Sequence, residues 1–277
     1  MNMPIKNKAI SYGLPQDKFN TELVKEYCED LNCILDMPRK PVGVKLLFTE
    51  EEYDDIEWRE PGGQLAYCCI VEKATRGMSF KARLKHINCD GGTTALALEP
   101  STPRIESGAE YFSYNLYATQ ATARRVREGV KGLYRTGSPT YGIAVAPLED
   151  FEITPDVVIL IVNPYQAMRL QQGYVYHTGE RINSTVAAMQ GICSEVTVEP
   201  YMEGRMNIST LCPSTRFLAK WKAEEMSIGI PFERFTSTVE GVLATLNTTD
   251  NVDTKEEIAK RFKEKNKDAS FITYDIK

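Results

Sequence analysis

The sequence predicts an α/β fold, or an α+β one, in which a mixed sheet is flanked by helices. Segments with the apolar period of a helix alternate along the chain with short apolar segments of strand length, as in a sheet covered by helices. The clearest strand lies at 156–162, which is apolar after its first residue, largely β-branched and followed by Pro164. Apolar side chains at consecutive positions indicate burial on both faces, which places this strand at the centre of the sheet.

The first elements follow from periodicity and from proline. Apolar residues at three- and four-residue intervals predict a helix over 17–34, which ends before Pro38 because proline blocks helix continuation. The apolar run 41–48 is predicted as a buried strand. A helix is expected over 65–73, and the loosely alternating segment 78–87 is expected to be a strand.

Similar elements fill the rest of the chain. A basic helix over 118–134 precedes a strand over 141–147, and a helix over 165–174 follows the central strand. We expect a helix of small residues over 185–191, an extended segment over 196–201 and a short strand over 207–211. A helix is expected over 217–223, and a charged terminal helix over 255–265.

Composition and charge exclude several classes of function. The 277 residues include 33 basic and 38 acidic side chains, for a formal net charge of −5, and 42% are hydrophobic. This acidic balance, without any block of Lys and Arg, counts against nucleic-acid binding. No apolar run approaches the roughly 20 residues of a membrane span, and no apolar signal segment stands at the N-terminus, so we expect a cytosolic protein. The P-loop, G-x-S-x-G and G-x-G-x-x-G motifs do not occur, which gives NTPases, lipases and dinucleotide-binding dehydrogenases no support.

The order of elements indicates an internal duplication within a single domain over 1–277. Half-repeats over 17–117 and 118–235 each run from helix to strand, small-residue helix, strand, cysteine and helix. The segment 236–277 is expected to be helical and peripheral. The alternative is coincidence among generic α/β elements.

The spacing of cysteines repeats as well. Cys69 and Cys89 are 20 residues apart, and Cys193 and Cys212 are 19 residues apart. If the halves are related, we expect their cysteine loops to face one shared cleft.

Cys89 and Cys212 are the strongest candidates for chemistry among the seven cysteines. Each stands where a predicted strand gives way to a helix, the first of these helices over 94–98. Backbone N–H groups and the helix dipole at such a position favour the thiolate, which lowers the pKa and makes the sulfur a better nucleophile or metal ligand. The alternative is that they are small buried hydrophobic residues, as we expect for Cys28 and Cys33.

The residues after each of these cysteines are predicted to bind a small anionic molecule. Glycine lets the backbone approach an anion closely, hydroxyl groups donate hydrogen bonds, and a guanidinium matches a carboxylate or phosphate. The predicted ligand-binding residues are Gly91, Gly92, Thr93, Ser214, Thr215 and Arg216.

Four cysteines could instead converge on a metal. Cys69, or its neighbour Cys68, would join Cys89, Cys193 and Cys212 as thiolate ligands of tetrahedral zinc or of an iron–sulfur cluster. No close C-x-x-C pair supports this set, and the sequence alone does not fix the cofactor.

Eight short segments of the sequence match the motifs of a known family. These segments are 41–46, 68–69, 89–92, 146–149, 155–158, 163–168, 193–195 and 229–231. Together they resemble the DUF family numbered 169, a prokaryotic group of uncharacterised proteins found widely in anaerobes and archaea. The resemblance covers about 38–235 and carries no activity with it, but the four cysteine positions lie among the motif loops. Cys212-Pro213-Ser214 departs from the C-x-G form expected of the family, which weakens the equivalence of the two cysteine loops.

Three functions are compatible with these observations. The first is a protein that holds a small anionic ligand or a thiolate-held cofactor in a cysteine-lined cleft. Such a protein could be a cysteine-dependent enzyme of anaerobic metabolism, with Cys89 or Cys212 as the catalytic thiolate. The second is an iron–sulfur or metal-binding redox protein, and the third is a non-catalytic small-molecule-binding accessory protein. A homo-oligomer is also compatible with the sequence, and the basic helix and the terminal helix are its candidate interfaces.

Overall fold

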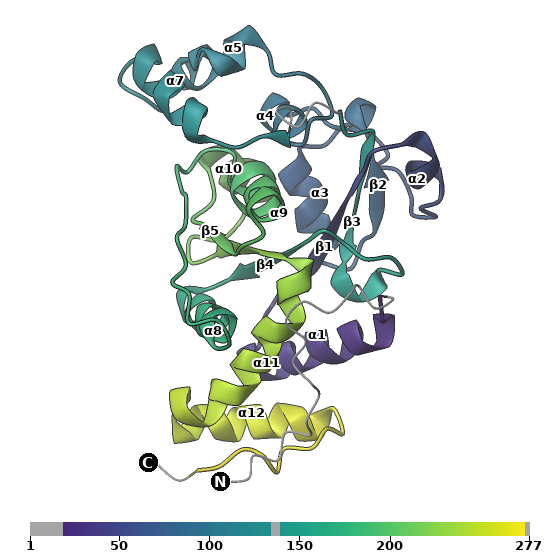
Figure 1. The fold of residues 1–277 in the computed structure, drawn as a ribbon, viewed down its shortest axis with the longest axis vertical. Coiled ribbons are helices and arrows are strands. Elements are labelled where there is room, and N and C mark those ends of the chain that lie inside the picture. Colours follow the sequence, from purple (N-terminus) through teal and green to yellow (C-terminus); the bar gives the residue numbers. More distant parts are fainter. Residues whose placement is uncertain (1–18, 134–138, 275–277) are drawn as a thin grey trace.

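The computed structural model describes residues 19–133 and 139–274, which form a six-stranded sheet with helices on both faces (Figure 1). The strands lie in the order β2–β3–β1–β4–β6–β5, and every pair of these strands is antiparallel. Their bounds are β1 Val42–Leu47, β2 Phe80–Ala82, β3 Gly142–Pro147, β4 Val157–Val162, β5 Asn207–Ser209 and β6 Met226–Pro231. The predicted α/β class with flanking helices is confirmed, although the sheet is antiparallel rather than mixed.

Two apolar cores separate the sheet from the helices on its two faces. The helices of the first core are α3 (Tyr67–Ala74), α4 (Asp90–Ala95), the π-helix η4 (Gly191–Val198) and α10 (Pro213–Ala219). The helices of the second core are α1 (Thr21–Leu35), α8 (Pro164–Val175), α11 (Phe232–Thr249) and α12 (Val252–Glu264). Alternate residues of β4 enter the two cores, with Ile159 in the first and Leu160 in the second, so this strand is buried on both faces as predicted.

Local sequence sets the ends of the longer helices. α1 begins after Asn20, whose side chain accepts a backbone N–H of the first turn, and it ends at Asp36 in the left-handed conformation shortly before Pro38. At the start of α8, the side chains of Asn163 and Gln166 each accept the backbone N–H of the other, which forms a capping box.

The two halves of the sheet repeat one strand register. β1 and β4 pair with each other at the centre, β1 then pairs outward with β3 and β4 with β6, and these carry the edge strands β2 and β5. The matching pairs are Val42–Pro147 and Val157–Pro231 in the inner ladders, and Phe80–Val145 and Asn207–Gly229 in the outer ladders. This pairing groups β3 with β1 and β2, although β3 lies after 117, where the first half was predicted to end. Descent of the two halves from one duplicated unit stays a prediction.

A small lobe is inserted between α4 and β3, at the top of Figure 1. Its helices are α5 (Pro103–Glu106), α6 (Ala109–Ser113) and α7 (Gln120–Gly129), so the helix predicted over 118–134 is shorter than expected. Tyr111 and Ala123 of the lobe share a core with Met189, which belongs to the second half of the chain. The other short elements are α2 (Glu50–Asp54), η1 (Leu84–His86), η3 (Leu148–Asp150) and α9 (Glu199–Glu203).

The segment 185–203 departs most from the prediction. Residues 185–190 form no helix, and 196–201 is helical rather than extended because η4 continues directly into α9. β-Branched residues such as Val196 favour a strand, but this segment packs tightly on β6. A β-carbon on Gly229 would lie 2.2 Å from the carbonyl oxygen of Val196, so the close approach of helix and strand requires glycine there. Packing on the sheet thus overrides local preference.

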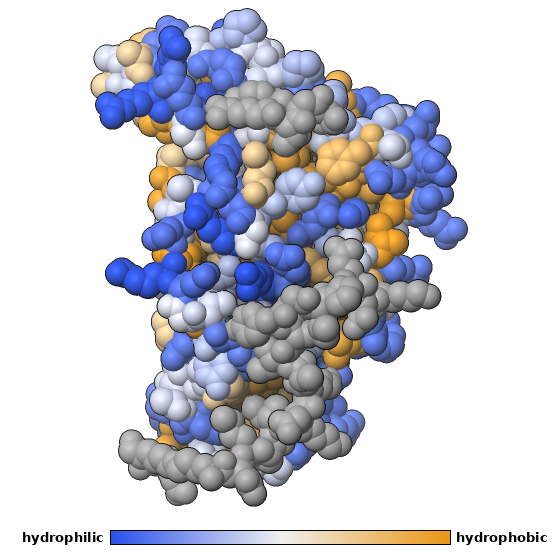
Figure 2. Space-filling model, in the orientation of Figure 1, coloured by the Kyte–Doolittle hydropathy of each residue, from blue (hydrophilic) through white to orange (hydrophobic). Residues whose placement is uncertain are grey.

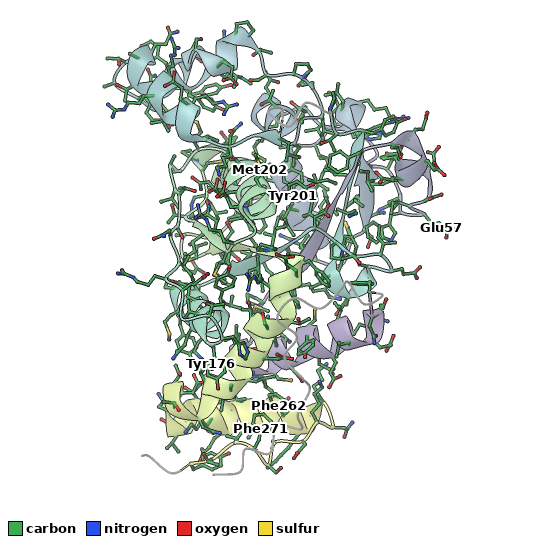
Figure 3. All side chains as sticks on the ribbon, viewed as in Figure 1. Glu57, Tyr176, Tyr201, Met202, Phe262 and Phe271 are labelled. Atoms are coloured by element: carbon green, nitrogen blue, oxygen red, sulfur yellow. The ribbon has the colours of Figure 1, made fainter. Side chains whose placement is uncertain are left out.

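The C-terminal segment is helical as predicted, but it is not peripheral. Val242 of α11 and Ile258 of α12 are fully buried in the second core, and α11 crosses α8 so closely that a β-carbon on Gly241 would lie 2.2 Å from the carbonyl oxygen of Gly173. Phe262 of α12 packs edge-on against Phe271, with ring centroids 5.5 Å apart (Figure 3).

The described helices include none that is both long enough and apolar enough to span a membrane. Figure 2 shows a face of the molecule that is largely hydrophilic, with hydrophobic residues in scattered areas.

Candidate functional site

Three helices start at or beside cysteine residues on the same face of the sheet. Cys89 is the residue before α4, Cys212 is the residue before α10, and Cys193 lies in the first turn of η4. Backbone N–H groups of the first turn face each sulfur. The N–H of Thr215 donates to the sulfur of Cys212 over 3.4 Å, and N–H groups of the corresponding turns act on the other two sulfurs and favour their thiolate forms.

The structure brings these three thiols close enough together to influence one another. Charge on Cys89 or Cys212 raises the pKa of Cys193, after the larger effect of burial, and charge on Cys212 raises the pKa of Cys89. Cys193 and Cys212 are buried, whereas Cys89 is half-buried. We call Cys89, Cys193, Cys212 and the neighbouring Cys68 the cysteine cluster.

Cys68, rather than Cys69, is the member that α3 contributes. A hydrogen bond to Cys69 and burial raise the pKa of the Cys68 thiol, and charge on Cys89 raises it further. Cys69 is half-buried, and the hydrogen bond that its sulfur accepts from Cys68 lowers its pKa to about 7. The predicted site residue Cys69 therefore lies beside the cluster, not within it.

The cluster lies across the boundary between the two halves. The thiol of Cys193 donates to the carbonyl oxygen of Gly91, with 3.6 Å between sulfur and oxygen, and the side-chain amide of Gln190 donates to the same oxygen over 2.6 Å. On the other side of η4, a β-carbon on Gly191 would lie 2.8 Å from the backbone nitrogen of Cys212. The first turn of η4 is thus held between the two cysteine loops.

Burial overturns the expected low pKa of Cys89. The backbone N–H groups of Gly91 and Gly92 do lower the pKa of this thiol, as its place at a helix start predicts, but burial raises it by more. Burial likewise holds the pKa of Cys193 well above its ordinary value. In the absence of a ligand these thiols are therefore protonated at neutral pH, which makes them poor nucleophiles.

Arg216 is not available to bind an anion. Its guanidinium group donates to the backbone carbonyl oxygens of Thr210, Lys222 and Glu225 over 2.9, 2.6 and 2.8 Å. These bonds connect α10 to the strand ends on either side of it. The side chain that was predicted to bind a carboxylate or phosphate therefore has a structural role.

The other predicted ligand-binding residues are mostly engaged as well. The hydroxyl of Thr93 donates to Glu99 and to carbonyl oxygens of its own turn, and Ser214 is exposed. Thr215 is buried beside Cys212, and its hydroxyl accepts a hydrogen bond from that thiol over 3.0 Å. Gly91 and Gly92 do lie at the cluster, where their backbone approaches Gln190 and Cys89.

Two polar side chains at the cluster were not predicted from the sequence. The hydroxyl of Tyr111 and the side-chain oxygen of Gln190 are buried, and neither has a hydrogen-bond partner within the described part of the chain. Tyr111 belongs to a tyrosine-rich stretch, which was the only sequence signal for it, and nothing distinguishes Gln190. Tyr111 comes to Gly91 because the lobe packs on Met189, and Gln190 comes to it because α4 contacts η4.

Comparison with known protein families assigns most of the chain to one family. The profile of DUF169, described as "Uncharacterised ArCR", matches residues 30–241. The chain belongs to the DUF169 family. The matched region of this DUF169 chain contains the sheet, the lobe and the whole cysteine cluster.

One relative of this DUF169 chain is a protein of Methanocaldococcus jannaschii named "Uncharacterized protein MJ0308". The two are 23% identical over 222 residues, which cover 79% of this chain and 93% of the relative. No solved structure matches the chain.

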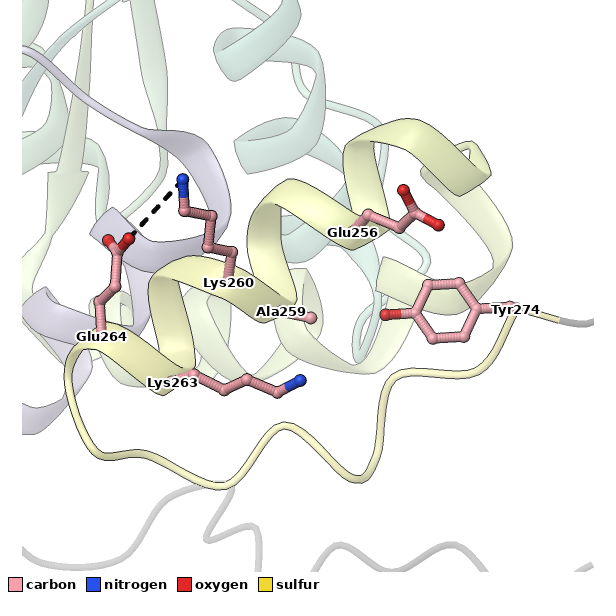
Figure 4. Close-up of a pocket in the computed structure, with 6 residues that line it drawn as sticks. All are labelled: Glu256, Ala259, Lys260, Lys263, Glu264 and Tyr274. Atoms are coloured by element: carbon pink, nitrogen blue, oxygen red, sulfur yellow. Dashed lines mark ion pairs between the residues drawn. The ribbon is translucent and has the colours of Figure 1, made fainter.

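Among the described residues the cysteine cluster is not assembled as a single-ion metal site, and it lines neither of two surface pockets. Within 19–133 and 139–274, no three His, Cys, Asp or Glu side chains are placed to hold a metal ion, so the predicted set of Cys69, Cys89, Cys193 and Cys212 is not assembled as a single-ion site. One pocket of about 510 Å³ lies beside α12 and Tyr274 (Figure 4), and one of about 840 Å³ lies beside α1. Neither of these two pockets is lined by a member of the cluster.

Proposed function

We propose that this DUF169 protein binds a thiolate-held cofactor, an iron–sulfur cluster, through Cys89, Cys193 and Cys212. The observation that carries the proposal is the meeting of three cysteine sulfurs, each at a helix start and each faced by backbone N–H groups. Hydrogen bonds to sulfur stabilise thiolate ligands and tune the potential of such clusters. Cys68 is the candidate for the fourth ligand.

The protonation of the thiols supports a cofactor more than a free nucleophile. Burial keeps Cys89 and Cys193 neutral, so neither is ready to attack a substrate at neutral pH. A bound metal displaces the thiol protons and neutralises the resulting negative charge, so burial then favours the complex. The engaged guanidinium of Arg216 leaves the proposal of a small anionic ligand with less support.

Of the two thiolate-held cofactors, a cluster has more support than zinc. A tetrahedral zinc ion requires its four sulfurs within about 2.3 Å of one centre, and the described residues contain no group placed for a single ion. An iron–sulfur cluster distributes its cysteines over several iron atoms, so its ligands stand further apart. All seven cysteines are free thiols, as is usual in a reducing compartment. We therefore propose that the protein acts in the cytosol.

Metal analysis of protein purified without oxygen tests the proposal. We expect stoichiometric iron and acid-labile sulfide in the wild type, and loss of both in the Cys89→Ser, Cys193→Ser and Cys212→Ser variants. Cys28→Ser and Cys33→Ser are matched controls, because these cysteines are buried in the second core and should leave iron content unchanged. Cys68→Ser and Cys69→Ser then identify the fourth ligand. Iron-free protein after anaerobic reconstitution would refute the proposal.

A further inference from the structure

We propose that Tyr111 and Gln190 form a polar pocket beside the cysteine cluster that binds a small neutral molecule carrying an N–H or O–H donor, such as a primary amide. This pocket does not require the proposed cofactor, so the two proposals can fail separately. The class of ligand also differs from the small anion that the sequence predicts.

The first observation is that both side chains are buried with an unused polar atom. Tyr111 is 9% exposed and Gln190 is 5% exposed, and the Tyr111 hydroxyl and the Gln190 Oε1 have no hydrogen-bond partner among the described residues. Buried polar groups in proteins are nearly always paired, with protein, water or a ligand. Two unpaired groups at one place therefore point to a partner that the described residues do not supply.

The second observation is that the two groups flank the same point. A β-carbon on Gly91 would lie 3.2 Å from the side-chain nitrogen of Gln190 and 3.4 Å from the hydroxyl of Tyr111. These distances are close to van der Waals contact, so Gly91 marks the place where the two polar side chains meet. Tyr111 reaches it from α6 of the lobe, and Gln190 reaches it from the residue before η4, where its backbone is left-handed with a φ of 54°.

The orientation of the amide determines which ligands fit. The Gln190 nitrogen donates to the carbonyl oxygen of Gly91 over 2.6 Å, which leaves Oε1 as a pure acceptor. A ligand must therefore present a donor to Gln190, while the Tyr111 hydroxyl can donate or accept. A carboxylate has only acceptors and would repel Oε1, whereas an amide or an alcohol satisfies both groups.

The pocket is adjacent to the thiols. The carbonyl oxygen of Gly91 accepts the hydrogen bond from the Cys193 thiol over 3.6 Å, and the β-carbon position of the same residue lies 3.4 Å from the Tyr111 hydroxyl. A molecule bound between Tyr111 and Gln190 would thus lie beside a cofactor held by the cluster. This is the position expected of a substrate.

Acetamide and acetate test the inference, because they have the same shape and differ in whether they can donate. Each is titrated into isotope-labelled protein while the side-chain amide signals of Gln190 and the backbone signal of Gly91 are followed by NMR. We expect saturable shifts with acetamide and none with acetate. Tyr111→Phe should weaken acetamide binding roughly threefold to tenfold, the effect of one hydrogen bond, without lowering the melting temperature, since its hydroxyl has no protein partner to lose.

Gly91→Ala gives an independent test, because its methyl group would press on both Gln190 and Tyr111. The residue lies within α4, where alanine is favoured over glycine, so we expect a folded protein that no longer binds acetamide. Gly129→Ala is the matched control, since nothing lies within 4 Å of its β-carbon position. The inference is overturned if acetate binds as tightly as acetamide or if Gly91→Ala binds acetamide normally. It is also overturned if neither probe shifts the Gln190 signals, because a buried water would then pair the two groups. Iron content is measured on the same samples: amide binding without iron refutes only the cofactor, and iron without amide binding refutes only this pocket.

Discussion

The thiol of Cys193 donates to the carbonyl oxygen of Gly91, 3.6 Å away, although 102 positions separate the two residues. This hydrogen bond connects the first turn of η4 to the loop that carries Cys89. The cysteine loops come together because helices of the two halves pack on one another, α4 on η4 and α3 on α10. A site of this kind depends on the close approach of backbone segments, and glycine makes that approach possible at several points.

Gly191→Ala tests this dependence. Its β-carbon would lie 2.8 Å from the backbone nitrogen of Cys212 and 3.0 Å from the Cα of Leu211, and backbone atoms cannot move aside as a flexible side chain can. We expect a loss of about 1–3 kcal/mol in the free energy of unfolding, measured by urea denaturation. The control Gly129→Ala should stay within about 0.5 kcal/mol of wild type. Equal stability of the two variants would mean that the loops have room to separate.

Alkylation should identify Cys69 as the reactive thiol. Its pKa is lowered to about 7 by the hydrogen bond from Cys68, and it is half-buried, whereas burial raises the pKa of Cys89 and Cys193. The rate of reaction with iodoacetamide should rise roughly tenfold from pH 6 to pH 8 and then level off, following the thiolate fraction. Mass spectrometry locates the modified residue, and Cys69→Ser should remove the fast phase. Fast labelling of Cys89 in metal-free protein would contradict this order of thiol reactivity.

The sequence was a good guide to the elements with a strong local signal and a poor guide to those shaped by packing. β4 and α8 lie within a residue or two of their predicted positions, because continuous apolarity and a Pro164 start are local features. The helical 196–201 segment was missed, since β-branched residues favour a strand and only the contact with Gly229 shows why they do not form one.

The candidate site was likewise predictable only where the signal in the sequence is local. Sequence position alone identified Cys89 and Cys212 as residues at helix starts. The role of Arg216 could not be predicted, because its three partners are carbonyl groups whose positions depend on how α10 meets β5 and β6. Gln190 was missed for a similar reason: its partner Gly91 is 99 positions away.

Glu195 should make the protein less stable as the pH rises. It accepts hydrogen bonds from the backbone N–H of Ala187 and from Ser209, but burial is the larger effect and raises its pKa above 4.5. The folded state then holds a proton that the unfolded state has lost. This contribution to stability is complete below pH 4.5 and is lost as the pH rises through the folded-state pKa.

Glu195→Gln removes that titration while retaining an acceptor for Ala187. We expect the stability of this variant relative to wild type to increase between pH 4.5 and pH 7, measured by urea denaturation at several pH values. Glu224→Gln changes an exposed carboxylate and should show no such trend. A constant difference between Glu195→Gln and wild type across this range would show that Glu195 titrates alike in the folded and unfolded states.

A buried ion pair should contribute to stability on the opposite face of the sheet. The guanidinium of Arg169 lies 3.1 Å from the carboxylate of Asp250 with both side chains fully buried, and it also donates to Thr245 and to the carbonyl oxygen of Val242. Arg169→Met removes the cation beside the buried carboxylate, which keeps only the hydrogen bond from the Tyr165 hydroxyl among the described residues, and should cost about 3–5 kcal/mol. Asp250→Asn in the same chain should recover part of that loss, because it removes the unpaired charge. Urea denaturation of both single variants and the double variant gives the coupling free energy between the two residues. If the losses of the single variants add to that of the double variant within about 0.5 kcal/mol, the two residues act independently. Lys25→Met, which breaks the exposed pair with Glu22, should change stability by less than about 1 kcal/mol.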